Sequence, residues 1–158
     1  MAQLKEARSG SRRASERDPA LLGQLIRDVH MAFRAAVDEA LRPQGLSLRQ
    51  VAVLASLKRS PGQSNADLAR GASMTPQSMV EVVRGLEGAA LVGRRPHPGG
   101  GRALQAQLTP AGVAALTAGR AVIAQTESKL LSGLSMGERR QLRHLLERAL
   151  ALLRPQRS

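Results

Sequence analysis

Helix-start signals are the feature of this sequence that most limits how it can fold. A Ser, Thr or Asp side chain before a helical segment accepts a hydrogen bond from a free backbone N–H of the first turn, and Pro fits the first helical position. Two such signals, Asp18-Pro19 and Thr109-Pro110, open long segments whose apolar residues recur at helical spacing. The complete set predicts helices that begin at Asp18, Ser47, Ser64, Thr75, Thr109 and Ser135.

Turn residues indicate where these helices end. Pro43 and Gly45 close the first helix, and the "SPG" at 60–62 closes the second. The second helix contains "VAVLASL" and is apolar almost all round, so we expect it at the centre of the core. A tight link from Gly71 to Met74 joins the short third helix to the fourth.

The fourth helix, Thr75 to Glu87, is amphipathic. Its apolar residues recur at i, i+3, i+4 and i+7, so they share one face that we expect in the core. These residues are Met79, Val82, Val83 and Leu86. The opposite face is polar and consists of Gln77, Ser78, Glu81 and Arg84. On an isolated helix such a face would simply be solvated, so its interpretation depends on the neighbouring elements.

A β-hairpin follows the fourth helix. The "LVGRR" stretch predicts one strand, and residues 104–108 ("LQAQL") alternate between apolar and polar side chains as in a half-buried strand. The "PHPGGG" between them fits only a turn or loop. A short helix, a tight turn, a capped amphipathic helix and a basic hairpin together predict a winged helix-turn-helix.

The predicted fold class is therefore mainly α with a small β-hairpin wing, in which further helices flank the winged helix-turn-helix. Four segments follow from this assignment. They are a disordered basic tail at 1–17, a first helix at 18–46, the winged helix-turn-helix at 47–108 and two long helices at 109–154.

Charge indicates the kind of partner. The chain of 158 residues carries 24 Lys and Arg against 12 Asp and Glu, a net charge of +12, which favours an anionic partner. Residues 47–108 and 109–158 each hold eight basic and three acidic residues. Phe33 is the only aromatic residue, so recognition of single strands by base stacking is not expected. The charge alone would also fit a very soluble surface, but with the predicted winged helix-turn-helix we expect double-stranded DNA as the partner.

The sequence lacks the residues of an enzyme. Catalysis would need a nucleophile with a base, paired carboxylates or a metal cluster. The chain has no Cys, and His30, His97 and His144 show no metal-ligand spacing. We therefore expect no catalytic site, metal site or cofactor. No apolar run could span a membrane and no signal peptide is evident, so we expect a cytoplasmic protein with no membrane partner.

The order of these elements, with several matching stretches, resembles the MarR family of transcriptional regulators. The matching stretches are "LSLRQVAVLASL", "NADLA", "MTPQSMVEVVRGLEGAALVGRR" and "GRALQAQLTPAG". The resemblance covers roughly residues 20–153 and rests on the order and spacing of the motifs, because none of them is specific alone.

The resemblance implies how such a protein works. The first helix and the last two would pack against their twins in a homodimer, and two reading helices would face successive major grooves of a near-palindromic operator. Binding would repress by occluding a promoter. Many members release DNA when a small aromatic, often phenolic, effector binds between the dimer helices and the DNA-binding region. We expect His30 and Phe33 to border that ligand-binding pocket.

The wing departs from the family pattern at two positions. The matching positions are Arg102, Leu108 and Thr109. Gly100 stands where the family has an Asp that shapes the tip, and Ala106 stands where it has Val. With glycine at Gly99, Gly100 and Gly101, the sequence leaves the conformation of the tip open.

In this context the polar face of the fourth helix is interpreted as the base-reading surface. Gln77 can bond bidentately to adenine, and Ser78 can bond to several bases. We expect Arg84 on phosphate, whereas Glu81 either accepts from cytosine or orients Arg84. The candidate DNA-binding residues are Ser64, Thr75, Gln77, Ser78, Glu81, Arg84, Arg94 and Arg102.

A sequence-blind, nucleoid-type DNA-binding protein is the alternative function. It would use the same positive charge but would need no organised reading helix. Binding to a preferred site in the presence of bulk competitor DNA separates the two functions.

Overall fold

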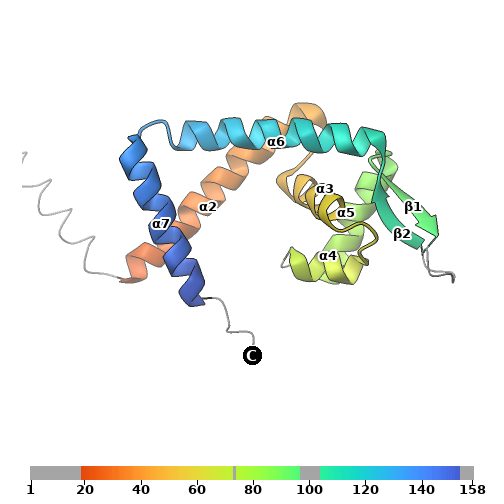
Figure 1. Ribbon diagram of the computed structural model, residues 1–158, viewed down its shortest axis with the longest axis horizontal. Coiled ribbons are helices and arrows are strands. Elements are labelled where there is room, and N and C mark those ends of the chain that lie inside the picture. The colour runs from red at the N-terminus through yellow and green to blue at the C-terminus, as the bar shows by residue number, and fades with distance from the viewer. Residues whose placement is uncertain (1–18, 73, 97–103, 154–158) are drawn as a thin grey trace, which may run out of the picture.

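The computed structural model describes residues 19–72, 74–96 and 104–153, and over these residues the chain is mostly helical with one antiparallel hairpin (Figure 1). This confirms the predicted fold class. The basic tail at 1–17, the glycines Gly99 to Gly101 and Arg102 lie outside the described residues. The elements are α2 (Pro19–Leu41), the 3₁₀ helix η1 (Arg42–Gln44), α3 (Leu48–Arg59), α4 (Asn65–Gly71), α5 (Pro76–Gly88), β1 (Val92–Pro96), β2 (Leu104–Leu108), α6 (Pro110–Leu130) and α7 (Met136–Leu153).

Side-chain caps start the helices at the predicted positions. Ser47 Oγ accepts from the backbone N–H of Gln50 at 3.3 Å, and Gln50 Oε1 accepts from the backbone N–H of Ser47 at 2.9 Å. Each bond satisfies an N–H that the helix itself leaves without a partner. Asp18 lies outside the described residues, and the other predicted starts are confirmed at Ser47, Ser64, Thr75, Thr109 and Ser135.

The turn between α2 and α3 is held by backbone conformation and by a carboxylate. Gly45 has a φ of 65°, in the left-handed region that glycine adopts without strain, and it ends η1. Asp38 Oδ1 on α2 then accepts from the backbone N–H of Leu48 at 2.7 Å. A negative charge at the start of α3 also interacts favourably with the positive end of the helix dipole. The start of α3 is thereby fixed to α2.

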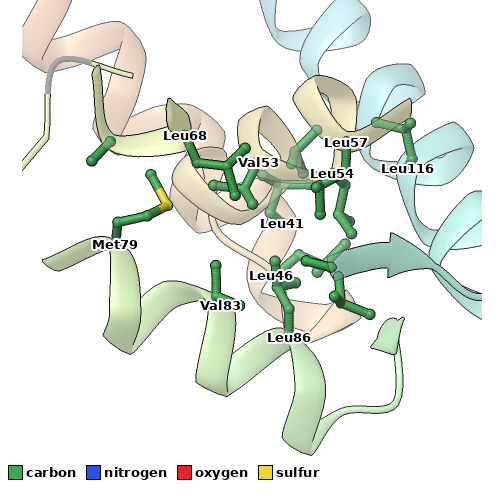
Figure 2. Packing of buried hydrophobic residues seen from close by; sticks show 14 of the residues in the cluster. Leu41, Leu46, Val53, Leu54, Leu57, Leu68, Met79, Val83, Leu86 and Leu116 are labelled. Atoms are coloured by element: carbon green, nitrogen blue, oxygen red, sulfur yellow. The ribbon is translucent and has the colours of Figure 1, made fainter. Parts of the chain in front are cut away.

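The core lies between α3, α4, α5, the hairpin and the facing parts of α2 and α6, as the packed side chains in Figure 2 show. Helix α3 is central, as predicted, because Val51, Val53, Leu54 and Leu57 are all buried. From α5, the residues Met79, Val83 and Leu86 are completely buried, and Val82 is partly buried against the same cluster. This confirms the predicted core face of α5.

The hairpin is tied to the core through the middle of β2. In its register Val92 pairs with Leu108 and Arg94 with Ala106, and the Ala106 side chain is fully buried. The Ala106 carbonyl also accepts from the backbone N–H of Gly62 at 3.3 Å, so the turn after α3 lies beside β2. Gly62 has a φ of 81°, which favours glycine at this contact.

Thr109 joins three elements at one point. Its hydroxyl donates to the carbonyl of Ala90 at 2.8 Å and accepts from the backbone N–H of Gly112 at 3.0 Å. Its own backbone N–H donates to the carbonyl of Leu91 at 3.1 Å. The end of α5, the start of β1 and the start of α6 therefore meet at this residue.

The molecule has two regions joined by α6. In Figure 1, α6 runs along the top, with the helix-turn-helix and hairpin below one end and α7 with the N-terminal half of α2 at the other. The second region leaves apolar side chains uncovered, and α7 has no buried residue at all. None of the helices within the described ranges has the length and apolar character needed to cross a bilayer.

Candidate DNA-binding interface

Helices α4 and α5 form the helix-turn-helix. The link between them is short, and the backbone N–H of Met74 donates to the carbonyl of Ala69 at 2.9 Å, which closes the end of α4. Leu68 and Ala69 of α4 are buried in the same core as Met79 of α5. Since the apolar side of α5 is fixed in this core, its opposite side faces outward.

The outward side of α5 carries most of the predicted reading residues. The side chains of Gln77, Glu81 and Arg84 are exposed, whereas Ser78 lies at the flank and is partly buried. Thr75 is the helix cap: it accepts from the backbone N–H of Ser78 at 3.1 Å and donates to Ser78 Oγ at 2.9 Å. The cap leaves the hydroxyl proton of Ser78 available to another acceptor.

Ser64 has a comparable role at the start of α4. Its hydroxyl donates to Asp67 Oδ2 at 2.6 Å and accepts from the backbone N–H of Asp67 at 3.1 Å. The Ser64 hydroxyl and backbone N–H hold the pKa of the Asp67 carboxyl below its usual range, and the neighbouring Arg70 adds to the effect. Ser64 is exposed, but its side chain is engaged in this capping box.

The two arginines of β1 are placed differently. The Arg94 guanidinium donates through Nε to Glu87 Oε1, an ion pair that connects β1 to α5. Arg95, the next residue along β1, is exposed and forms no ion pair with a described residue. Arg84 on α5 is likewise unpaired within the described part of the chain. Arg84 and Arg95 are therefore cations that can approach an external anion without giving up an ion pair to any described residue.

A groove between α2 and the helix-turn-helix contains one of the two predicted pocket residues. It has a volume of about 290 Å³ and brings His30 together with two arginines that the sequence analysis did not select, Arg34 and Arg49. Phe33 does not line this groove; it packs partly buried against the core. The remaining lining residues are Leu48, Ala52, Ala72 and Met74.

The groove borders the contact that fixes the start of α3. Arg34 Nε lies 3.8 Å from Asp38 Oδ2, the other oxygen of the carboxylate that accepts from Leu48. Arg34 and Arg49 also line an adjoining hollow of about 400 Å³ that reaches Glu81 of α5. The two arginines therefore lie between the groove and the reading helix.

Sequence reasoning missed Arg34, Arg49 and the exposure of Val80 on α5. His30 and Arg34 are one helical turn apart, so the sequence could have predicted that they lie on the same side of α2. Arg49 belongs to another helix and meets them only after folding. Val80 interrupts the spacing of the core positions on α5, which is a signal that it points away from the core.

A short helix, a tight link, a second helix with an exposed polar side and an adjoining hairpin define a winged helix-turn-helix protein. Comparison with known proteins refines this class. Residues 46–104 match the sequence model of the MarR family. The HTH-type transcriptional repressor Rv2887 of Mycobacterium tuberculosis is 40% identical over 131 residues, which span 83% of this chain and 94% of the repressor. The chain belongs to the MarR family.

Solved structures of that repressor are similar in fold. The crystal structure of Rv2887 in complex with DNA has a TM-score of 0.69 and 38% identity, and the match covers 81% of this chain and 96% of that one. The complex of Rv2887 with salicylic acid has a TM-score of 0.70 and 39% identity, over 81% of this chain and 95% of that one.

Proposed function

We propose that this protein is a transcriptional repressor, not an enzyme, that binds double-stranded DNA selectively as a homodimer and releases it when a small aromatic acid binds. The observation that carries the proposal is the outward side of α5. Gln77, Glu81 and Arg84 are exposed on a helix whose other side is anchored in the core, so their positions are set before DNA arrives. The Rv2887 complex with DNA supports the same partner.

The roles of these residues follow from their chemistry. Gln77 lies in the first turn of α5, the part of a reading helix that meets base edges, and its amide can bond bidentately to adenine. Ser78 donates its hydroxyl proton to a neighbouring base or phosphate. Arg84 and Arg95 hold phosphate, and Glu81 accepts from cytosine or orients Arg84.

The remaining candidates act at the edge of the interface. Thr75 is exposed at the start of α5, where backbone N–H groups favour a phosphate. Ser64, whose hydroxyl donates to Asp67, acts by fixing the start of α4. Arg94 positions the wing through Glu87. Arg102 at the wing, outside the described residues, enters the flanking minor groove, where narrow A·T-rich DNA concentrates negative potential.

One experiment distinguishes recognition of bases from sequence-independent attraction to the charged DNA backbone. A preferred site is selected from randomised duplexes, and affinities for it and for random DNA are measured by fluorescence anisotropy at several salt concentrations. Gln77→Ala should cost about 1–3 kcal/mol on the selected site and leave random DNA unaffected. Arg84→Ala should weaken both and lower the salt slope by about one. Equal losses for Gln77→Ala on both DNAs would favour the sequence-blind alternative.

Uncovered apolar side chains support the homodimer. Leu22 and Leu25 on α2 are 59% and 58% exposed, and Leu145 and Leu150 on α7 are 51% and 50% exposed. Apolar area of this extent on two helices is covered in stable proteins by another protein surface. A symmetric contact between two copies covers both helices and places two α5 helices on one DNA.

The groove supports a carboxylate-bearing effector. Arg34 and Arg49 supply two guanidinium groups, which bind carboxylates with charge-assisted hydrogen bonds, and His30 adds a third nitrogen-bearing side chain. Leu48, Ala52 and Met74 supply an apolar wall for an aromatic ring. The walls come from α2, α3 and the link before α5, so a bound ligand fixes the spacing between the dimer helices and the helix-turn-helix. Salicylic acid bound to Rv2887 has this chemistry.

Salicylate is therefore the first effector to test. Calorimetry should show binding to the wild type, and salicylate should weaken DNA binding by the same factor by which DNA weakens salicylate binding. Arg49→Ala should reduce both effects without changing DNA affinity in the absence of ligand. Salicylate binding that survives both Arg34→Ala and Arg49→Ala would exclude this groove.

A further inference from the structure

Val80 is an exposed apolar side chain on the reading helix. It is 37% exposed, and among described residues 48–72, 74–95 and 105–108 it is the only large apolar side chain in the exposed class. It lies three positions after Gln77 and four positions before Arg84, so the three side chains are neighbours on the surface of α5. Val80 therefore lies between the residue proposed to read a base edge and the residue proposed to hold phosphate.

The folded protein alone gives no reason for Val at this position. The other side of α5 fills the core, and a β-branched residue is a poorer helix former than Ala on a solvent-facing surface. The dimer surface does not explain it either, because α5 and α7 lie in different regions of the molecule (Figure 1). The other exposed large apolar side chains of the described residues all belong to α2, α6 and α7.

The major groove offers one apolar feature, the C5-methyl group of thymine. We propose that Val80 determines sequence specificity by packing against a thymine methyl in each half-site of the operator. This inference rests on the proposed DNA-binding function and adds a recognised base to it. Gln77 and Val80 then read neighbouring bases through different chemistry, one by hydrogen bonds and the other by apolar contact.

Deoxyuridine tests this contact because it differs from thymidine only by the missing methyl group. With the full chain, each thymine of the selected site is replaced in turn by uracil, symmetrically in both half-sites. For wild type, one replacement should weaken binding by about fourfold per half-site, the effect of exposing one methyl-sized group. Val80→Ala should weaken binding to the thymine site by a similar factor and should bind the uracil site as well as wild type does.

Gln77→Ala is the matched control, since its loss should be the same on thymine and uracil sites. Selection repeated with Val80→Ala should lose the thymine preference at that one position and keep the others. If the losses in affinity from Val80→Ala and from uracil multiplied when combined, the assignment of Val80 would be wrong. A site at which every thymine tolerates uracil would have the same consequence, and both outcomes would leave the proposed function standing. If no preferred site emerges for wild type, the proposed function fails together with this inference.

Discussion

At the scale of single residues, Ala90 occupies a conformation that suits glycine. Its φ is 56°, and it follows α5 where the backbone N–H groups of Ala90 and Leu91 donate to the carbonyls of Glu87 and Leu86, both at 2.9 Å. This is the Schellman arrangement that ends many helices with a left-handed glycine. The Cβ of Ala90 therefore strains the turn between the reading helix and the wing.

Ala90→Gly should raise the free energy of unfolding by about 1 kcal/mol, because it removes the left-handed penalty of an L-residue. Urea denaturation at one fixed protein concentration measures the change. Ala89→Gly is the control: its φ is −83°, so it should lower the free energy by about 0.5–1 kcal/mol. A lower stability for Ala90→Gly would contradict the strain.

The surroundings of Gly112 leave no room for a side chain. It is buried at the start of α6, and a Cβ built there would lie 2.0 Å from the carbonyl oxygen of Leu91. Because backbone cannot rotate away as a side chain can, Gly112→Ala should lower the free energy of unfolding by about 3 kcal/mol. Gly88→Ala, with nothing within 4 Å, should be neutral or raise it by up to about 1 kcal/mol in the same urea experiment. Similar stability for the two variants would mean that the start of α6 shifts freely.

At the scale of elements, the start of α7 depends on a carboxylate. The Ser135 hydroxyl donates to Glu138 Oε2 at 2.7 Å, and the Ser135 backbone N–H does so at 2.8 Å. Both hydrogen bonds hold the pKa of Glu138 below its usual range, and the bond from the hydroxyl has the larger effect. Because the pKa of Glu138 is lower in the folded than in the unfolded chain, the ionised carboxylate stabilises the folded state at pH values above the unfolded pKa. This contribution is lost as the pH falls through the folded pKa.

Ser135→Ala should therefore raise the pKa of Glu138 towards its usual range, as an NMR titration of the side-chain carboxyl would show. The pKa of Asp67 is the internal control, because its partner is Ser64 and it should stay lowered in the variant. An unchanged pKa for Glu138 would show that the hydroxyl does not cap α7 in solution.

The sequence predicted those parts of the fold that depend on near neighbours. The caps of Ser47, Thr75 and Thr109 join residues three apart, so the residue types alone revealed the helix starts. The alternation at 104–108 likewise located β2. These signals are local, so the elements that they predict form in the same places whatever the packing of the rest of the chain.

Contacts between distant elements were outside the reach of those signals. Nothing in the spacing of Arg94 indicates its partner, because Glu87 belongs to another element. Arg34 and Arg49 form the groove only once α2 packs beside α3. Phe33, expected at the pocket from the resemblance, instead packs its apolar ring partly buried against the core. The residues that line the groove were therefore only partly predictable, through His30.

At the scale of the whole molecule, the uncovered helices predict a dimer that buries upwards of about 2,000 Å² in total. Leu146 is 49% exposed on α7, so Leu146→Arg should leave the core intact and separate the copies. Light scattering at micromolar concentration should then give the mass of one chain, 16.8 kDa, instead of twice that value. His144→Arg on the same helix should leave the dimer unchanged. A wild type of 16.8 kDa would refute the dimer and the two half-sites with it.

The hydrogen bonds of Thr109 have a mechanical consequence. Because one residue holds the end of α5, the start of β1 and the start of α6, we expect the reading helix and the wing to move with α6 as a rigid body. An effector that fills the groove between α2 and the helix-turn-helix should then shift α5, the wing and the start of α6 together relative to α2. The chain has no native Cys, so pairs of introduced spin labels can report this directly. Within a protomer, the distance from α5 to the start of α6 should stay constant when salicylate binds, whereas the distance between the two α5 helices should change.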